Sequence, residues 1–198
     1  MQEDLTQYGK TFPLMEAAGI IQKTNNISQK IPFIIDTTED HKLNSFFKYK
    51  SRMVEVGKMD VQLSMKMGIH KTAEDIGDEM RFQYVSACKH GGNCVYDLGQ
   101  SVPLKWRKMC GMAKYKFNQS TIFNVSKMRS REYFAEIVKP EEDRYDELDI
   151  PIEPKEDLTI GVMIDVEDTE RIPEVLKDAR QVFINFDETF EVLVCVPE

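Results

Sequence analysis

The sequence has no apolar run that approaches the roughly 18 residues of a membrane-spanning helix. We also expect no cleaved signal peptide, because Met1–Asp4 is acidic where such a peptide needs positive charge, and residues 12–21 are interrupted by Pro13, Glu16 and Gly19. Without a signal, the four cysteines are expected to be reduced. We therefore expect a cytoplasmic protein with no transmembrane segment.

No catalytic motif of fixed spacing is complete. The chain contains neither of the phosphate-binding patterns GxGxxG and GxxxxGK[ST], and neither of the hydrolase patterns GxSxG and HExxH. The absence of these motifs makes an enzyme, which would have to belong to an undetected family, less favoured than the two binding functions given at the end of this subsection. A cleft that holds converging polar groups, with perturbed carboxylates or His70 among them, would favour it.

Charge is plentiful but unevenly distributed. The net charge is −8, yet residues 1–131 carry 20 basic and 13 acidic side chains, whereas residues 132–198 carry 6 basic and 21 acidic ones. The segment 98–131, here called the basic segment, contains no acidic residue. Its cations and one aromatic neighbour form the predicted anion-binding set: Lys105, Trp106, Arg107, Lys108, Lys114, Lys116, Lys127, Arg129 and Arg131.

Further aromatic residues run through the basic segment, namely Tyr115, Phe117 and Phe123. Cations beside aromatic faces suit phosphate contacts combined with base stacking, or an anionic lipid surface with an aromatic anchor. Two plainer alternatives stay open. The cations could form a solvated face, or a patch that packs against the acidic part of the same chain.

Three of the four cysteines and one of the three histidines lie close together in the sequence: Cys88, His90, Cys94 and Cys110. Thiolates and an imidazole can bind zinc tetrahedrally, and no other cofactor is expected. The spacing departs from the paired Cys-x2-Cys pattern, and Cys88 also fits the apolar stripe of a helix, so buried free thiols are the favoured interpretation. A Cys–His nucleophile would need a third orienting group, which the sequence does not supply.

The patterning of the first half predicts antiparallel strands. Apolar and polar residues alternate over 59–70, as in a strand with one exposed face, and 47–56 is expected to pair with it in a hairpin. Ile31–Ile35 is expected to be an edge strand because Pro32 cannot donate to a central ladder. We therefore predict an α+β fold, a largely antiparallel sheet with two amphipathic helices packed on it.

The two helices have local start signals. Thr72 followed by Asp75 predicts a helix over 73–89, and a cap at Asp168 or Thr169 predicts another after a strand at 158–166. Shorter elements are expected at 94–98 (strand), 115–125 (strand), 129–138 (helix) and 183–196 (closing hairpin).

Residues 140–157 combine an acidic excess with three prolines, which predicts a linker or mobile loop. This segment divides the chain into a main region, 1–139, and a strand–helix–hairpin unit, 158–198, that is either separate or part of the same domain. Inside the linker, Tyr145 and Leu148 form a Tyr-x-x-Leu pattern that could engage a partner groove.

These features favour a non-enzymatic binding and assembly protein. The basic segment would contact an anionic lipid surface or a nucleic acid, in the cytoplasm or at a membrane surface, while the acidic part binds protein or a second copy of the chain. Viral matrix and accessory proteins have this general character, which is an analogy of type without a family signature. The alternative is a single-stranded RNA-binding module, favoured if the aromatic residues of the basic segment share one face with its lysines.

Overall fold

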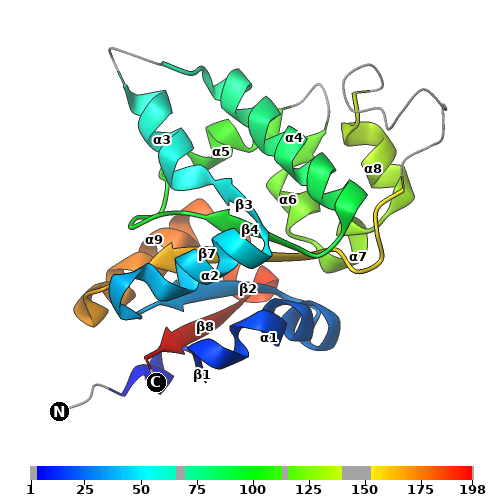
Figure 1. Ribbon diagram of the computed structural model, residues 1–198. Coiled ribbons are helices and arrows are strands. Elements are labelled where there is room, and N and C mark those ends of the chain that lie inside the picture. The colour runs from blue at the N-terminus through cyan, green and yellow to red at the C-terminus, as the bar shows by residue number, and fades with distance from the viewer. Residues whose placement is uncertain (1–3, 66–69, 113–115, 140–152, 198) are drawn as a thin grey trace.

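The computed structural model describes residues 4–65, 70–112, 116–139 and 153–197 (Figure 1). Its centre is a six-stranded sheet in which every pair of neighbours is parallel. In spatial order the strands are β1 (Lys10–Pro13), β8 (Phe190–Val196), β2 (Ile31–Asp36), β7 (Thr159–Asp165), β4 (Asn93–Asp97) and β3 (Arg52–Glu55). The predicted antiparallel α+β fold is therefore wrong, and the fold is α/β.

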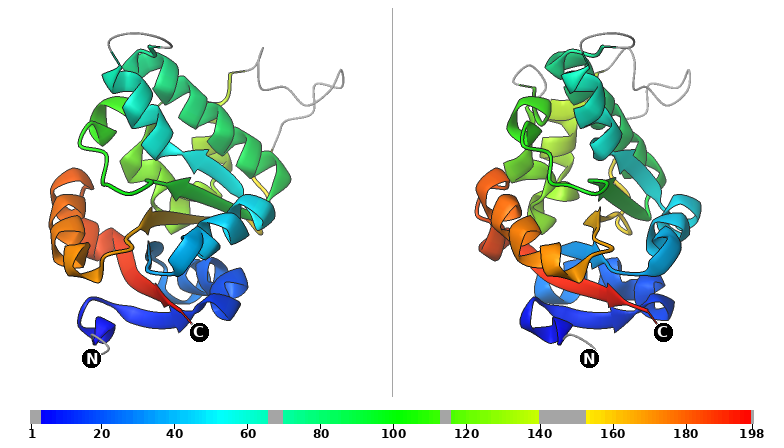
Figure 2. Two further views of the ribbon diagram at one scale, coloured as in Figure 1. Left: turned by 60° about the vertical axis from the view of Figure 1, so that its left-hand side comes forward. Right: turned by 90° about the vertical axis from the view of Figure 1, so that its left-hand side faces the viewer.

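Helices cover both faces of the sheet (Figure 2). One face packs on α1 (Ala17–Lys23) and α2 (Lys42–Lys50). The other face packs on α3 (Val56–Ser64), α4 (Ala73–His90) and α9 (Ile172–Val182). Shorter elements complete this second layer: α5 (Trp106–Met109), β5 (Gly111–Met112), β6 (Phe117–Asn118), α6 (Gln119–Ile122), α7 (Val125–Met128), α8 (Arg131–Ile137) and α10 (Phe186–Thr189).

The strand predicted over 59–70 is wrong as far as the structure describes that stretch, because α3 occupies 56–64. The helix buries Val56 and Met59, and Leu63 packs against the same core, so the apolar residues follow a helical face. Val61, which the alternation would place inside, is 56% exposed. The predicted hairpin partner, 47–56, divides between the end of α2 and β3.

The strand predicted at 31–35 is present as β2, but its predicted edge position is wrong, because β2 lies in the interior of the sheet with neighbours on both sides. Pro32 is accommodated at the second position of the strand, before pairing with β7 begins at Phe33. All residues of β2 are buried, as expected for a parallel strand covered on both faces.

The strand predicted at 158–166 is present as β7, but its alternation separates the two faces of the sheet, both of which are buried, instead of a buried face from an exposed one. All seven residues are buried, and Ile21 of α1 packs against Gly161 so closely that an added Cβ would lie 3.1 Å from it. The closing hairpin predicted at 183–196 is wrong, because 186–189 form α10 and β8 runs parallel to both its neighbours.

Elements with strong local signals are where they were expected. The capping box of Thr72 and Asp75 begins α4, Asp168 caps the turn that leads into α9, and β4 and α8 are present. The irregular strand expected at 115–125 is wrong where it is described, since only the short β6 is extended there and α6 follows it. In the described part of the chain, no helix has the length and apolar character needed to cross a membrane.

Candidate functional site

Three aspartates end three neighbouring strands of the sheet. Asp36 is the last residue of β2, Asp165 of β7 and Asp97 of β4, and β7 lies between the other two. Asp36 is the register partner of Asp165. The residues two positions earlier all belong to the apolar cluster beneath α1 and α2, so the three carboxyl groups project toward this same layer.

The chain leaves β2 and β7 toward opposite faces of the sheet. Residues after Asp36 lead to α2 on one face, whereas residues after Asp165 lead to α9 on the other. Diverging connections of this kind open a crevice at the carboxyl ends of parallel strands, where open α/β sheets bind their ligands. Asp36 and Asp165 therefore lie in the crevice at the carboxyl ends of β2 and β7, where this topology favours a binding site.

A pocket of about 660 Å³ opens beside this crevice. Two of the three aspartates, Asp97 and Asp165, line it. The lining also includes His41, which precedes α2, Asn44 and Lys48 of α2, and Lys58 of α3. The two lysines are exposed. Asp40 and Glu55 also line the pocket, and Lys58 contacts Glu55, so charges of both signs surround the buried carboxyl groups.

Asp36 is only 2% exposed. Its Oδ1 accepts hydrogen bonds from the backbone nitrogen of Thr38 at 2.9 Å and from the Thr38 hydroxyl at 2.7 Å. Its Oδ2 is buried and has no hydrogen-bond partner among the described residues. The carboxyl group of Asp165 lies within hydrogen-bond reach of Asp36, and it can donate to Asp36 only when it is protonated.

Burial of Asp165 and the neighbouring charge of Asp36 raise the pKa of Asp165 to about 6. His41 opposes the shift, since its Nδ1 lies 3.1 Å from Asp165 Oδ2, and its Nε2 lies 3.3 Å from Glu167 Oε1. The charge of Asp97 raises the same pKa further. The three aspartates therefore form one electrostatic cluster.

Asp97 is held by hydrogen bonds on both of its carboxyl oxygens. Oδ1 accepts from the backbone nitrogen of Gly99 and Oδ2 from the Asn44 amide, each at 2.9 Å. Asn44 belongs to α2, so this bond ties the helix to the end of β4. Asp97 is thereby fixed in orientation at the pocket wall.

The connection from β2 to α2 contains two consecutive non-glycine residues in the left-handed region, Asp40 (φ 59°) and His41 (φ 51°). This conformation is unfavourable for side chains other than glycine and recurs at functional sites. Here it turns the chain so that His41 meets Asp165.

Sequence reasoning missed this cluster, although a signal was present. Each of the three aspartates directly follows an apolar run, and these runs are Phe33–Ile35, Val95–Tyr96 and Met163–Ile164. Once the strands are known to be parallel, carboxylates in this position must meet at one edge.

The aromatic residues of the basic segment are core residues. Trp106, Phe117 and Phe123 are all at most 4% exposed, and Trp106 stacks on Phe123 with ring centroids 5.6 Å apart. Trp106 Nε1 donates to Gln119 Oε1 at 2.9 Å. These rings therefore share no exposed face with the lysines, and Lys114 and Tyr115 lie outside the described residues.

Several cations of the basic segment contact other parts of the chain. Arg107 donates to the carbonyls of Gln181 and Val182 at the end of α9, and Arg129 donates to the carbonyl of Leu158. The other contacts are Lys105 with Ser64, Lys116 with Glu136, and Arg131 with Glu153. Lys108 and Lys127 are exposed. Binding of an anion by this set stays a prediction.

The fold does not gather the three cysteines around His90, since the thiols are buried and His90 is exposed. Cys88, Cys94 and Cys110 are buried free thiols, and burial raises the pKa of each, to about 12 for Cys94. The exposed His90 has its Nδ1 2.7 Å from the carbonyl of Ser86. Across the ranges that the structure describes, no three His, Cys, Asp or Glu side chains are grouped so as to hold a metal ion, and zinc binding stays a prediction.

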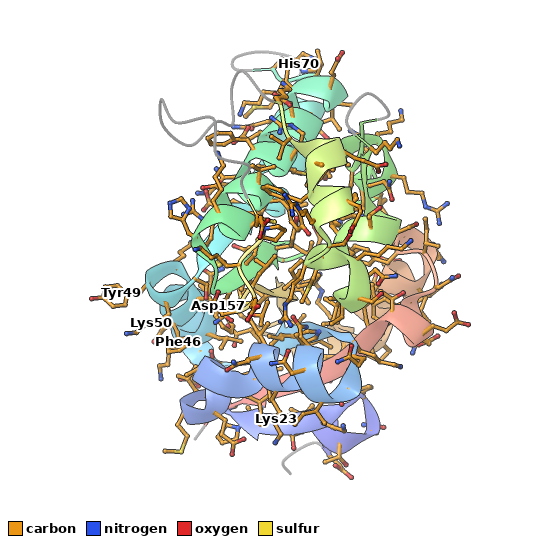
Figure 3. The ribbon with its side chains drawn as sticks, turned by 90° about the vertical axis from the view of Figure 1, so that its right-hand side faces the viewer. Lys23, Phe46, Tyr49, Lys50, His70 and Asp157 are labelled. Atoms are coloured by element: carbon orange, nitrogen blue, oxygen red, sulfur yellow. The ribbon has the colours of Figure 1, made fainter. Side chains whose placement is uncertain are left out.

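The remaining candidate residues lie away from the pocket or outside the described ranges. His70 lies at the end of the molecule formed by α3 and α4, with its Nδ1 2.9 Å from the carbonyl of Met65 (Figure 3). Tyr145 and Leu148 fall in 140–152, which is outside those ranges. No family model, no curated protein and no solved structure matches the chain.

Proposed function

We propose that the chain is an enzyme whose reacting centre is the cluster of Asp36, Asp97 and Asp165, and that it acts by hydrolysis or group transfer on a polar substrate held in the adjoining pocket. The observation that carries this proposal is the buried carboxyl pair, Asp36 and Asp165, set side by side in the crevice between β2 and β7. A cleft with converging polar groups and a perturbed carboxylate is the condition under which an enzyme is favoured.

A purely structural role explains the pair poorly. Two neighbouring buried carboxylates oppose each other's ionisation, and folding gains nothing from them that a neutral Asn could not provide. Unfavourable arrangements of this kind persist where chemistry requires them. Lys48 would attract a substrate that carries negative charge, whereas Lys58 contacts Glu55, which lines the same pocket.

The binding and assembly function expected from the basic segment remains a hypothesis. Its aromatic residues are buried where they are described, and most of its described cations contact the chain itself. These observations support the enzyme more strongly than either the membrane-binding or the single-stranded RNA-binding alternative.

A panel of chromogenic nitrophenyl substrates tests the proposal: a phosphomonoester, a phosphodiester, a carboxyl ester and a glycoside, each with and without Mg²⁺. We expect turnover of one class, reduced about 100-fold or more in Asp97→Asn and Asp165→Asn. Asp187→Asn, which removes an exposed partner of Arg180, should leave the rate unchanged. Absence of turnover for every class at high protein concentration would contradict an enzymatic function.

A further inference from the structure

Among the described residues, no cation pairs with both Asp36 and Asp165. His41 contacts Asp165 and Glu167, and its side chain is 41% exposed. Oδ2 of Asp36 is buried and has no hydrogen-bond partner in the described part of the chain, and a hydrogen bond between the two carboxyl groups requires a proton on one of them. A buried carboxylate oxygen without a partner is costly unless a bound group completes it.

We propose that Asp36 and Asp165 bind one divalent cation of the magnesium type, Mg²⁺ or Mn²⁺. The ion would lie between Asp36 Oδ2 and the carboxyl group of Asp165. Its remaining coordination positions would be open to water or substrate in the pocket. This inference rests on the proposed function, because the ion would be the cofactor of that same site.

The ligand chemistry selects the kind of ion. The carboxyl pair offers oxygen ligands, which magnesium and manganese prefer. Cys88, Cys94 and Cys110 are buried on the other side of the sheet, whereas Cys195 is the register partner of Asp36 on β8. Zinc and calcium sites use more protein ligands, and no group of three His, Cys, Asp or Glu side chains that could hold an ion is found among those residues. Magnesium typically binds one or two carboxylates and completes its shell with water and substrate oxygens.

Asp97 has a second role in this arrangement. Both of its oxygens are oriented by Gly99 and Asn44, so it is held at the pocket without being turned toward the carboxyl pair. A carboxylate held in this way can accept a hydrogen bond from metal-bound water. Lys48 lines the same pocket, and a cation beside a bound ion favours phosphate esters as the substrate class; Lys58, also in the lining, contacts Glu55.

Titration of the full chain with Mn²⁺, followed by electron paramagnetic resonance of the free ion, tests the site directly. We expect about one bound ion per chain, displaced by excess Mg²⁺. Melting measured in parallel should rise by roughly 5 °C or more when the metal is near a hundred times its dissociation constant.

Asp36→Asn is the decisive variant, and it should fold. Its side-chain oxygen can still accept from Thr38, while its amide can donate to Asp165 and relieve the repulsion of the pair. We therefore expect a higher melting temperature than wild type without metal, and at least a 30-fold loss of Mn²⁺ affinity. Asp165→Asn should lose affinity in the same way.

Asp168→Asn is the matched control. It removes one exposed negative charge on the same connection, three residues after Asp165, and Asn still caps the turn that Asp168 caps through the nitrogen of Glu170. This variant should bind Mn²⁺ as wild type does.

Two results would overturn the metal site: no Mn²⁺ binding by the wild-type chain, or undiminished binding by Asp36→Asn. Neither depends on a substrate, so the outcome is separable from the proposed function. Turnover that persists in a chelator would support the enzyme and show that its reaction does not need the ion. Mn²⁺ binding without any turnover would support the metal and contradict the enzyme.

Discussion

Arg81 places a charge in the core, since its side chain is 0% exposed. Its Nε donates to Asp78 Oδ1 at 2.9 Å and its Nη1 donates to the carbonyl of Ile137 at 3.0 Å, so it ties α4 to the end of α8. Lys139 also contacts Asp78, at 2.8 Å. Burial opposes ionisation of Asp78, but the hydrogen bonds from Lys139 and Arg81 outweigh it, and its pKa is lowered.

We expect Asp78→Asn to lower the free energy of unfolding by about 1–3 kcal/mol at pH 7, because Arg81 would lose its charged partner. A lowered pKa means that the stabilisation is complete above the ordinary value of 3.8 and is lost as the pH falls through the folded-state value. The difference between variant and wild type should therefore shrink below about pH 4. Urea unfolding at pH 7 and pH 3 measures it, with the exposed Asp187→Asn as control.

At the scale of single residues, the sequence predicts types of environment better than it predicts neighbours. Cys88 is expected to be a buried thiol on a helix, and it is buried in α4. No local pattern in the sequence predicts that Asp36 lies beside Asp165, because β2 and β7 pair across more than a hundred residues of intervening chain. The cations that flank Trp106 in the sequence favour a surface position for it. Trp106 is nevertheless buried, because its large apolar side chain gains more from burial.

The start of α3 is fixed by the close approach of Gly57 to β4. A Cβ on Gly57 would lie 2.6 Å from the carbonyl oxygen of Leu98, a contact that requires the helix or the strand end to move. Gly57 also lines the pocket beside the carboxylate cluster. The placement of one pocket wall therefore depends on the absence of a side chain here.

Gly57→Ala should destabilise the protein by about 1–3 kcal/mol. It should also change the NMR chemical shifts of the backbone amides of Leu98 and Gly99. Gly19→Ala is the opposite case, because no atom lies within 4 Å of an added Cβ on this residue of α1. That variant should stabilise by about 0.5–1 kcal/mol. Equal effects from the two substitutions would show that helix propensity, and not the contact with Leu98, governs both.

Helices with local start signals could be predicted, whereas strand direction could not. The capping box of Thr72 and the proline in the first turn of α9 act within a few residues of the chain. Whether β7 runs parallel or antiparallel to β2 is set by the crossover through several helices. In α3, Met59 and Leu63 fit both the alternating and the helical pattern, so the periodicity over this short stretch did not discriminate between them.

The whole sheet depends on the C-terminal part of the chain. β7 lies between β2 and β4, and β8 lies between β1 and β2, so residues 159–196 supply both neighbours of β2. A chain cut at a protease site inserted in 140–152 should therefore elute as one complex and unfold in one transition. Gel filtration and calorimetry of the cut protein test this, and a folded C-terminal fragment that elutes alone would contradict it.

The position of β2 also determines what happens during synthesis. Ile31–Asp36 leaves the ribosome long before Thr159, and at roughly 5–20 residues per second the interval is on the order of 10 s. Throughout that time this apolar strand has neither of its two sheet partners. An unpaired apolar edge invites association with other chains. The yield of folded protein is therefore decided by whatever covers β2 while the last quarter of the chain is still being made.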